Sequence, residues 1–391
     1  MIYLDNNATT RLDPRALEAM MPFLTDNFAN AASTHPFGVW ASEAVKTARQ
    51  QVANLLSCDP HELVFTSGAT EAINLAIKGV AESYGAAKRH IITVQTEHKA
   101  VLDVCQYLET RGFEVTYLPV QPAHSPNAGL VDLADLRAAL RPDTLLVAVM
   151  WVNNETGVIQ PIADMVRLTH EAGALFMTDA TQTVGKLPID VDAAGVDLLA
   201  FSAHKFYGPK GVGGLYVRQH SLAGTSVRKV KLEAVLHGGG HERGLRSGTL
   251  NVPGIVGMGK AAELARQEMG RDTTRIGTLR DQLETALLTI PGTRVNGTPE
   301  HRLYNTTNIY FDNCDSDALI MGLEGIAVSN GSACTAASID PSHVLLALGL
   351  NEQEAFSCLR LSLGRFNTEA DVTATVTAVE GIVEELRALV G

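Results

Sequence analysis

The chain has 391 residues, of which 46% are apolar, 19% are charged and 5% are aromatic. Its formal net charge of −12 at pH 7 argues against a nucleic-acid-binding surface, so we expect no direct nucleic-acid partner. The length is too great for one hydrophobic core, and we therefore expect two or three domains.

The sequence contains no apolar run of about 18 or more residues, so we expect neither a membrane-spanning helix nor a membrane partner. The opening residues, MIYLDNNATT, lack the basic and apolar segments of a signal peptide, which indicates a cytoplasmic protein. Five scattered cysteines form no C-x-x-C pair and no zinc-type cluster with histidines. We therefore expect neither a disulfide framework nor a metal site, and any cysteine that matters is expected to act as a thiol.

Strand and helix patterns alternate through the first two thirds of the chain. The expected strands are 62–67, 90–95, 114–120, 144–152, 174–179, 196–203 and 213–218. The expected helices between them are 69–84, 99–112, a segment near 132–141 and a segment near 161–173. Repeated β-α-β units of this kind predict an α/β fold, with a mainly parallel sheet that has helices on both faces.

The pattern changes after about residue 254. A helical stretch over 257–289 is followed by short strands, a helix at 316–325, a strand at 358–364 and a helical C-terminus, which indicates a smaller α+β domain. The boundary is the glycine-dense segment 237–254. Because it carries a histidine, a glutamate and two arginines, we interpret it as a functional loop in preference to a flexible linker.

Two groups of polar residues lie at predicted strand ends, where open α/β sheets bind their ligands. TSGATE at 66–71 opens a helix, and the backbone N–H groups near Gly68 with the Thr70 hydroxyl form a natural phosphate cradle. TDATQ at 178–182 places Asp179 after an apolar strand, with Gln182 three residues later. Each group, taken alone, is explained as well by ordinary helix capping.

Two further groups carry a lysine and a histidine. FSAHKFYGPKG at 201–211 places Lys205 directly after a strand end and before a glycine-rich turn. A lysine that reacts with a carbonyl needs such a cleft, because desolvation and nearby positive charge free its amine. His98, in TEHKA, begins a helix and can lie on a flat ligand and carry protons. A solvated lysine and a structural histidine are the alternatives.

The four groups together fit one ligand. The start of the helix at 69–84 can hold a phosphate, and Asp179 can pair with a pyridinium nitrogen. The His98 imidazole can stack on an aromatic ring, and Lys205 can react with an aldehyde. Pyridoxal 5′-phosphate (PLP) requires this set.

Nine blocks of the sequence, in order from residue 2 to past residue 365, resemble cysteine desulfurases. They are YLDNNATT, SGATEAINLAIKG, TEHKAVLDVC, VNNETGVIQPI, TDATQTVGK, SAHKFYGPKGVGGLYV, GGGHERGLRSGTLN, NGSACTAAS and LRLSLGRFNTE. The similarity is greater to the group that includes the nitrogen-fixation and housekeeping iron–sulfur-assembly enzymes. It implies a homodimer of PLP fold-type I, with a mainly parallel seven-stranded sheet in a large domain, 15–254. Residues 1–14 and 255–391 would form the smaller domain.

The resemblance also implies the role of individual residues. Lys205 would form the Schiff base with the cofactor, Asp179 would pair with the pyridinium nitrogen, and Gln182 would bond the phenolic oxygen. His98 would stack on the ring and help to move protons. The phosphate would be held by Ala69, Thr70, Ser202 and His204, with Thr249 added from the partner subunit. Asn153 and Arg360 would bind the substrate amino acid, since a guanidinium fork suits a carboxylate.

Cys334 lies in SNGSACTAAS, among small residues that are unlike a hydrophobic core. In the family, the matching cysteine is the nucleophile that takes sulfur from L-cysteine as a persulfide, while alanine leaves. The persulfide would then pass to a sulfur-acceptor protein such as an iron–sulfur scaffold, and Cys334 is conceivable as a transient iron–sulfur ligand by the same analogy. We read the other cysteines as structural; they are Cys58, Cys105, Cys314 and Cys358.

Some questions stay open at this point. FANAASTHPFG at 28–38 stands where many relatives carry a Gly-Asn-Pro-Ser run, and we expect a modest effect at the cleft rim from Ala29, Asn30 and Ala31. A selenocysteine lyase of the same fold is one alternative function. A sulfur carrier whose main role is to dock partner proteins is another.

Overall fold

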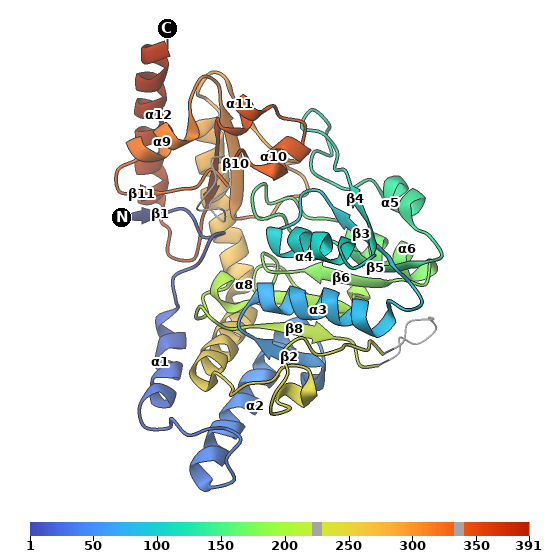
Figure 1. Cartoon of the computed structure of the whole chain (residues 1–391). Coiled ribbons are helices and arrows are strands. Elements are labelled where there is room, and N and C mark those ends of the chain that lie inside the picture. The colour runs from blue at the N-terminus through green and yellow to red at the C-terminus, as the bar shows by residue number, and fades with distance from the viewer. Residues whose placement is uncertain (221–228, 332–339, 391) are drawn as a thin grey trace.

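The computed structural model describes residues 1–220, 229–331 and 340–390. Its largest sheet has seven strands in the order β2-β8-β7-β6-β5-β3-β4 (Figure 1). Among these strands β8 alone runs against its neighbours, so the sheet is mainly parallel, as the sequence predicted. The bounds are β2 Leu63–Thr66, β3 His90–Val94, β4 Glu114–Leu118, β5 Thr144–Ala148, β6 Leu175–Asp179, β7 Leu198–Ser202 and β8 Gly213–Val217.

Helices cover both faces of this sheet, because its central strands are apolar on both sides and must be buried twice. Two separate apolar clusters result, one on each face. One face is covered by α3 (Ala69–Tyr84) and α4 (Lys99–Glu109). The helices on the other face include α2 (Pro36–Leu56), α5 (Leu133–Ala139), α6 (Ile162–Glu171), α7 (Val191–Ala194) and the first half of α8 (Val252–Leu287).

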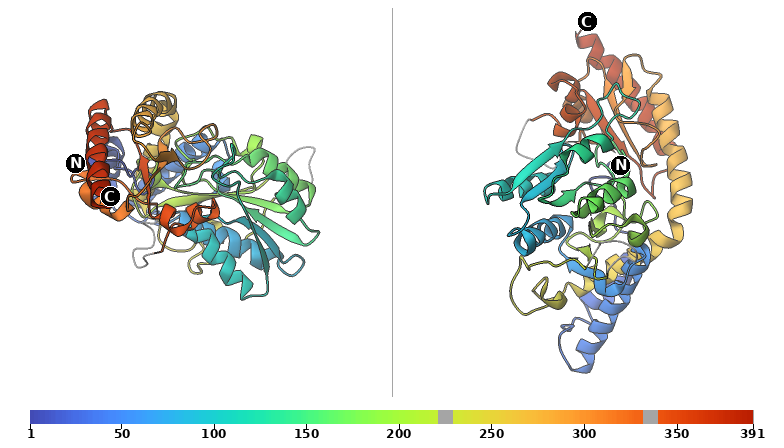
Figure 2. Two further views of the ribbon diagram at one scale, coloured as in Figure 1. Left: turned by 90° about the horizontal axis from the view of Figure 1, so that it is seen from above. Right: turned by 90° about the vertical axis from the view of Figure 1, so that its right-hand side faces the viewer.

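A third apolar cluster forms around a small antiparallel sheet in the order β12-β10-β9. The helix α8 runs alongside both sheets, and its second half packs on the small one (Figure 2). The elements near this sheet are β1 (Ile2–Tyr3), β9 (Thr293–Val295), β10 (Thr306–Phe311), α9 (Ser316–Gly322), β11 (Ile326–Ala327), β12 (Cys358–Ser362) and α12 (Glu369–Val390). The remaining elements are α1 (Pro14–Leu24), α10 (His343–Ala347), α11 (Glu352–Ala355) and the 3₁₀ turns Pro60–Glu62, Ala203–Lys205 and Glu242–Gly244.

The glycine-dense segment is fixed to the edge strand β2. The carboxylate of Glu242 accepts the backbone N–H of Phe65 at 2.8 Å and pairs with the Arg49 guanidinium at 2.5 Å. Glu242 and Arg243 both have positive φ, 47° and 59°, which side chains rarely adopt. These contacts keep the start of the segment in place, so it is not a free linker.

Within the described residues, no helix is long and apolar enough to cross a membrane.

Buried ion pairs join the start of the chain to its last third. Arg365 donates to Asp13 Oδ2 and to Asp272 Oδ2, at 2.8 Å in each case. Asp13 also accepts three hydrogen bonds from Arg15. Burial raises the pKa of Asp13, but the hydrogen bonds from Arg15 and Arg365 outweigh it and lower the pKa to about 2, from 3.8.

We expect Asp13 to make stability depend on pH under acidic conditions. The folded-state pKa lies below the unfolded value, so the contribution is present above about pH 4 and is lost as pH falls towards 2. The contribution is about 2 kcal/mol. Urea unfolding of Asp13→Asn should therefore show lower stability at pH 5 and a flatter loss towards pH 3. The exposed Asp26→Asn is the control, and equal slopes in all three proteins would contradict the assignment.

Candidate active site

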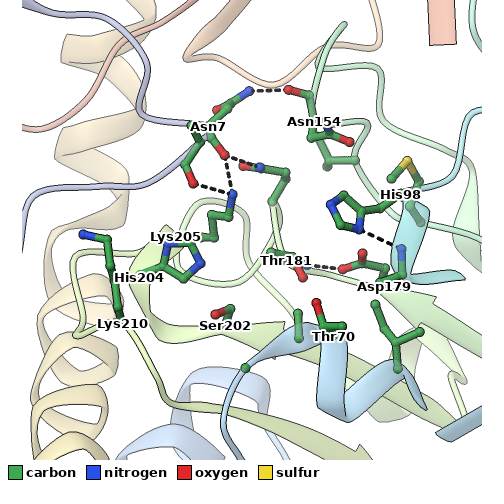
Figure 3. A pocket seen from close by; sticks show the side chains of 18 of the residues that line it. Asn7, Thr70, His98, Asn154, Asp179, Thr181, Ser202, His204, Lys205 and Lys210 are labelled. Atoms are coloured by element: carbon green, nitrogen blue, oxygen red, sulfur yellow. Dashed lines mark hydrogen bonds between the residues drawn. The ribbon is translucent and has the colours of Figure 1, made fainter. Parts of the chain in front are cut away.

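A cavity of about 520 Å³ lies at the carboxyl ends of the parallel strands, a volume typical of cofactor sites. It is lined by segments that are far apart in the sequence, including the start of α3, the end of β6, the turn after β7 and the N-terminal segment around Asn7 (Figure 3). Nine of the residues expected from the sequence line it: Ala69, Thr70, His98, Asp179, Gln182, Ser202, His204, Lys205 and Arg360.

The first turn of α3 forms one end of the cavity. Gly68 is the N-cap residue of this 16-residue helix, and no side chain caps the first backbone N–H groups. The Ser202 hydroxyl lies close to this helix start, since a Cβ atom built on Gly68 would be 3.5 Å from Ser202 Oγ. Uncapped N–H groups and the positive end of the helix dipole suit an anion such as a phosphate.

His98 and Asp179 lie on the same side of the cavity, across from Lys205 (Figure 3). His98 is the N-cap residue of α4, where its Nδ1 accepts the Ala100 N–H at 3.1 Å and fixes the ring. Asp179 ends β6, and its Oδ1 accepts the Thr181 N–H at 2.9 Å. A local structural role and a place at the ligand site are therefore not exclusive, since both side chains accept a local backbone N–H and also line the cavity.

Lys205 reaches into the cavity from the turn that follows β7. Its Nζ donates to the carbonyl oxygens of Asn7 at 2.5 Å and Ala8 at 2.8 Å. The amine is therefore held by the N-terminal segment at the cavity wall, and the alternative of a solvated surface lysine does not apply.

The electrostatic environment on the Lys205 side of the cavity is positive. The neighbouring His204 contacts Thr9 Oγ1 through its Nδ1 at 3.0 Å. Burial, followed by the charges of Lys205, Lys210 and Lys186, lowers the pKa of His204 to about 4. His204 is consequently uncharged at neutral pH, and the surrounding charges favour an anionic ligand.

Gln182 is held on both sides of its amide group. Its Nε2 donates to the Asn7 carbonyl at 2.9 Å, and its Oε1 accepts from Lys186 Nζ at 2.6 Å. Lys186 is buried, and burial together with the charges of Lys205 and Arg360 lowers its pKa to about 7. Lys186 and Asn7 contact this amide although no sequence pattern singled them out. Lys186 lies four positions after Gln182 in the block TDATQTVGK, and Asn7 lies in the block YLDNNATT.

Arg360, on β12, is almost fully buried and lines the cavity. Its Nη2 pairs with Asp5 Oδ1 at 2.6 Å, and its Nη1 donates to the Asn154 carbonyl at 3.1 Å. Its Nε is buried with no hydrogen-bond partner within the described parts of the protein. A buried guanidinium with an unused donor at a cavity is well suited to a ligand carboxylate.

Two expected residues do not line this cavity. The Asn153 side chain is buried against Thr96 O and the N–H groups of Glu155 and Thr156, and the next residue, Asn154, lines the cavity instead. Thr249 is exposed in the glycine-dense segment. Cys334 lies outside the described residues.

The Ala29-Asn30-Ala31 departure lies in the connection between α1 and α2. There, Asn30 Oδ1 accepts the Ala32 N–H at 2.9 Å and closes a local turn. None of the three residues is among those that line the cavity in the described chain.

The structure was also searched for groups of side chains that could bind a metal ion. Across 1–220, 229–331 and 340–390, no group of three or more His, Cys, Asp or Glu residues could hold a metal ion.

Comparisons with known proteins agree with this site. The family model described as aminotransferase class-V matches residues 2–375. A cysteine desulfurase IscS of Pectobacterium carotovorum subsp. carotovorum (strain PC1) is 52% identical over 391 residues, which cover 99% of this chain and 94% of the relative. The solved structure of a NifS-like protein has a TM-score of 0.89 and 40% identity, with 98% of this chain and 99% of that chain covered. SspA in complex with cysteine has a TM-score of 0.80 and 38% identity, with 94% and 100% covered.

These matches show that the chain belongs to the aminotransferase class-V family. Within that family it belongs to the cysteine desulfurases, PLP-dependent enzymes of fold-type I, which confirms the expectation from the sequence blocks.

The residues present fit PLP. The uncapped start of α3 suits its phosphate, Asp179 suits a ring nitrogen that carries a proton, and the Lys205 amine suits its aldehyde. The positive environment that lowers the pKa of His204 also matches the charge of the phosphate.

We expect the two adjacent asparagines to respond differently to substitution. Asn153→Ala leaves a buried carbonyl and two buried N–H groups without their partner and should cost about 2–3 kcal/mol of stability. Asn154→Ala removes a side chain at the cavity and should leave stability nearly unchanged while weakening ligand binding. Thermal unfolding and substrate titration of both variants check this. If Asn154→Ala unfolds at a lower temperature than Asn153→Ala, Asn154 is the structural residue and the assignment is wrong.

Proposed function

We propose that this protein removes sulfur from L-cysteine, releases L-alanine and passes the sulfur to acceptor proteins. The observation that carries the proposal is the arrangement of Lys205, Asp179 and Arg360 around one cavity at the carboxyl edge of the sheet. Each supplies a different requirement of a PLP-dependent reaction on an amino acid: an amine, a carboxylate and a carboxylate-binding guanidinium. The relative named as SspA in complex with cysteine is consistent with this substrate.

Residues around the cavity would hold PLP. Ala69 and Thr70 at the helix start, with Ser202 and His204, would hold its phosphate. Asp179 would keep a proton at the ring nitrogen, and Gln182 would donate to the phenolic oxygen. His98 would contact the ring. When bound, PLP withdraws electrons from the α-carbon of the amino acid, which makes loss of the α-proton feasible.

The substrate amino acid would bind in the cavity beside Lys205. The Arg360 guanidinium, which lines the cavity and is held in place by Asp5, would bind the substrate carboxylate. Asn154 takes the substrate-contacting role that the sequence assigned to Asn153, because its side chain is the one at the cavity. His98, fixed by its bond to Ala100, helps to move the α-proton.

Cys334 is the proposed nucleophile. Its thiolate attacks the sulfur of L-cysteine, so a sulfur–sulfur bond forms as the carbon–sulfur bond breaks. The electron pair of the broken bond stays with the carbon that becomes the alanine methyl group. Atoms balance as one L-cysteine and one thiol giving one alanine and one persulfide.

The assembly and its partners follow the family. We propose a homodimer in which Thr249 of one subunit contacts the phosphate of the other; its exposure in the monomer supports such a contact. The proposed domains are 15–254 and 1–14 with 255–391, and the separate apolar cluster around the small sheet supports this division. Sulfur acceptors such as an iron–sulfur scaffold and a cytoplasmic location complete the proposal.

Cys334→Ala tests the central step. The variant should retain the yellow colour of bound PLP but form neither persulfide nor alanine from L-cysteine, because the carbon–sulfur bond has no acceptor for its sulfur. Alanine release by the purified wild type, quantified by chromatography beside the variant, gives the comparison. We expect a loss of at least about 100-fold, the scale for removing a covalent nucleophile.

Cys58→Ala is the matched control. Burial raises the pKa of the Cys58 thiol, so that cysteine stays protonated and unreactive, and its variant should match the wild type. If Cys334→Ala releases alanine at the wild-type rate, Cys334 is not the nucleophile and the protein is a direct lyase, such as the selenocysteine enzyme. If the wild type binds PLP but releases no alanine, the proposed reaction itself is wrong.

A further inference from the structure

We propose that Lys186 is a positioning residue that fixes the direction of the Gln182 amide, so that the amide presents an N–H donor to the cavity. The inference rests on the proposed function, because it concerns the same PLP site. It goes beyond the roles given above, since Lys186 lies behind the cavity wall and not among the residues that line it.

The contacts of Gln182 leave one orientation for its amide. The Nζ of Lys186 carries N–H donors in both of its charge states, and the amide oxygen of Gln182 accepts from it at 2.6 Å. The carbonyl of Asn7 can only accept, so the atom that faces it at 2.9 Å must be the amide nitrogen. With one N–H given to Asn7, the second N–H of Gln182 is left for the cavity, which Gln182 lines.

Asn7 alone contacts only one side of the Gln182 amide. Its carbonyl oxygen also accepts from Lys205 Nζ at 2.5 Å. The terminal torsion of glutamine has two broad minima, so an amide bonded on one side only can turn over. Lys186 removes this freedom, because a turned amide would place its N–H donors against the lysine ammonium.

The local backbone is built to keep Lys186 inside. Gly185 has φ of 77°, and a Cβ there would lie 2.5 Å from Phe206 Cβ, next to Lys205. The turn therefore packs closely on the segment that carries Lys205, and directs the next side chain inward. Only 4% of Lys186 is exposed, although buried lysines are costly.

The charges around Lys186 make its burial costlier still. Lys205, from the turn after β7, and Arg360, from β12, are both cationic neighbours, and together with burial they lower its pKa to about 7. An apolar side chain of similar length would avoid the cost of burying a charge but would leave Gln182 Oε1 without its donor. The retention of a lysine there is explained by its hydrogen bond to Gln182.

The test is binding of PLP to the apoprotein of the full chain, with Lys186→Met, Gln182→Ala and the double variant compared with the wild type. Loss of one oriented hydrogen bond should raise the dissociation constant of PLP about tenfold in Lys186→Met. The absorbance spectrum of bound PLP should change in the same direction in Lys186→Met and Gln182→Ala, because both remove the donor to the phenolic oxygen. The double variant should bind PLP no more weakly than Gln182→Ala alone, since Lys186 acts through Gln182.

Thermal unfolding of the apoproteins separates positioning from a structural role. Lys186→Met should unfold close to the wild-type temperature, because relief of the buried charge offsets the lost donor to Gln182 Oε1. The control is Lys88→Met. Lys88 donates to the carbonyls of Thr144 and Gly173, and none of these three residues lines the cavity in the described chain. This variant should bind PLP like the wild type.

Three outcomes overturn the inference: wild-type affinity in Lys186→Met, additive losses in the double variant, or an affinity loss accompanied by a lower unfolding temperature. Failure of the proposed function would look different. The wild-type apoprotein itself would then bind no PLP, or the wild type loaded with PLP would release no alanine.

Discussion

The hydrogen bonds of Asn7 are the constraint on which the site depends. Its backbone N–H donates to Ser362 Oγ, and its side chain donates to Thr306 Oγ1 and to the Asn154 carbonyl. Its carbonyl accepts from both Lys205 and Gln182. One buried residue thus joins both sheets and orients two of the side chains that face the cavity. Together with the Ala8 carbonyl, the Asn7 carbonyl holds the Lys205 amine against the N-terminal segment, which is itself bonded to the small sheet.

Burial changes the protonation of two glutamates near this junction. Burial and then the charge of Asp179 raise the pKa of Glu97 well above its ordinary value, so this carboxyl is uncharged. Burial likewise raises the pKa of Glu155, which accepts a hydrogen bond from Ser342 Oγ at 2.5 Å. Asp179, Lys205 and Arg360 line the same cavity. A zwitterionic amino acid and an anionic cofactor meet complementary charges there.

The sequence predicted the strand and helix order well, because the central strands are apolar runs and the helices carry one apolar face. It also predicted nine lining residues, since each lies at a strand end or within a recognisable block. Two features were beyond it. The direction of β8 depends on its pairing with β2 and β7, which its own residues do not encode. The choice between Asn153 and Asn154 depends on which side chain the turn directs inward, and adjacent asparagines give no sequence signal.

The bonds of the N-terminal segment also decide when the site can exist during folding. Residues 5 to 13 contact partners about 200 to 360 positions later, among them Lys205, Ser362 and Arg365. Contacts of such long range carry a large loop-closure cost and form late. On the ribosome, residues 5–13 cannot make these contacts before residues 362–365 have been synthesised. The pocket therefore forms only after the small sheet is available to the N-terminal segment.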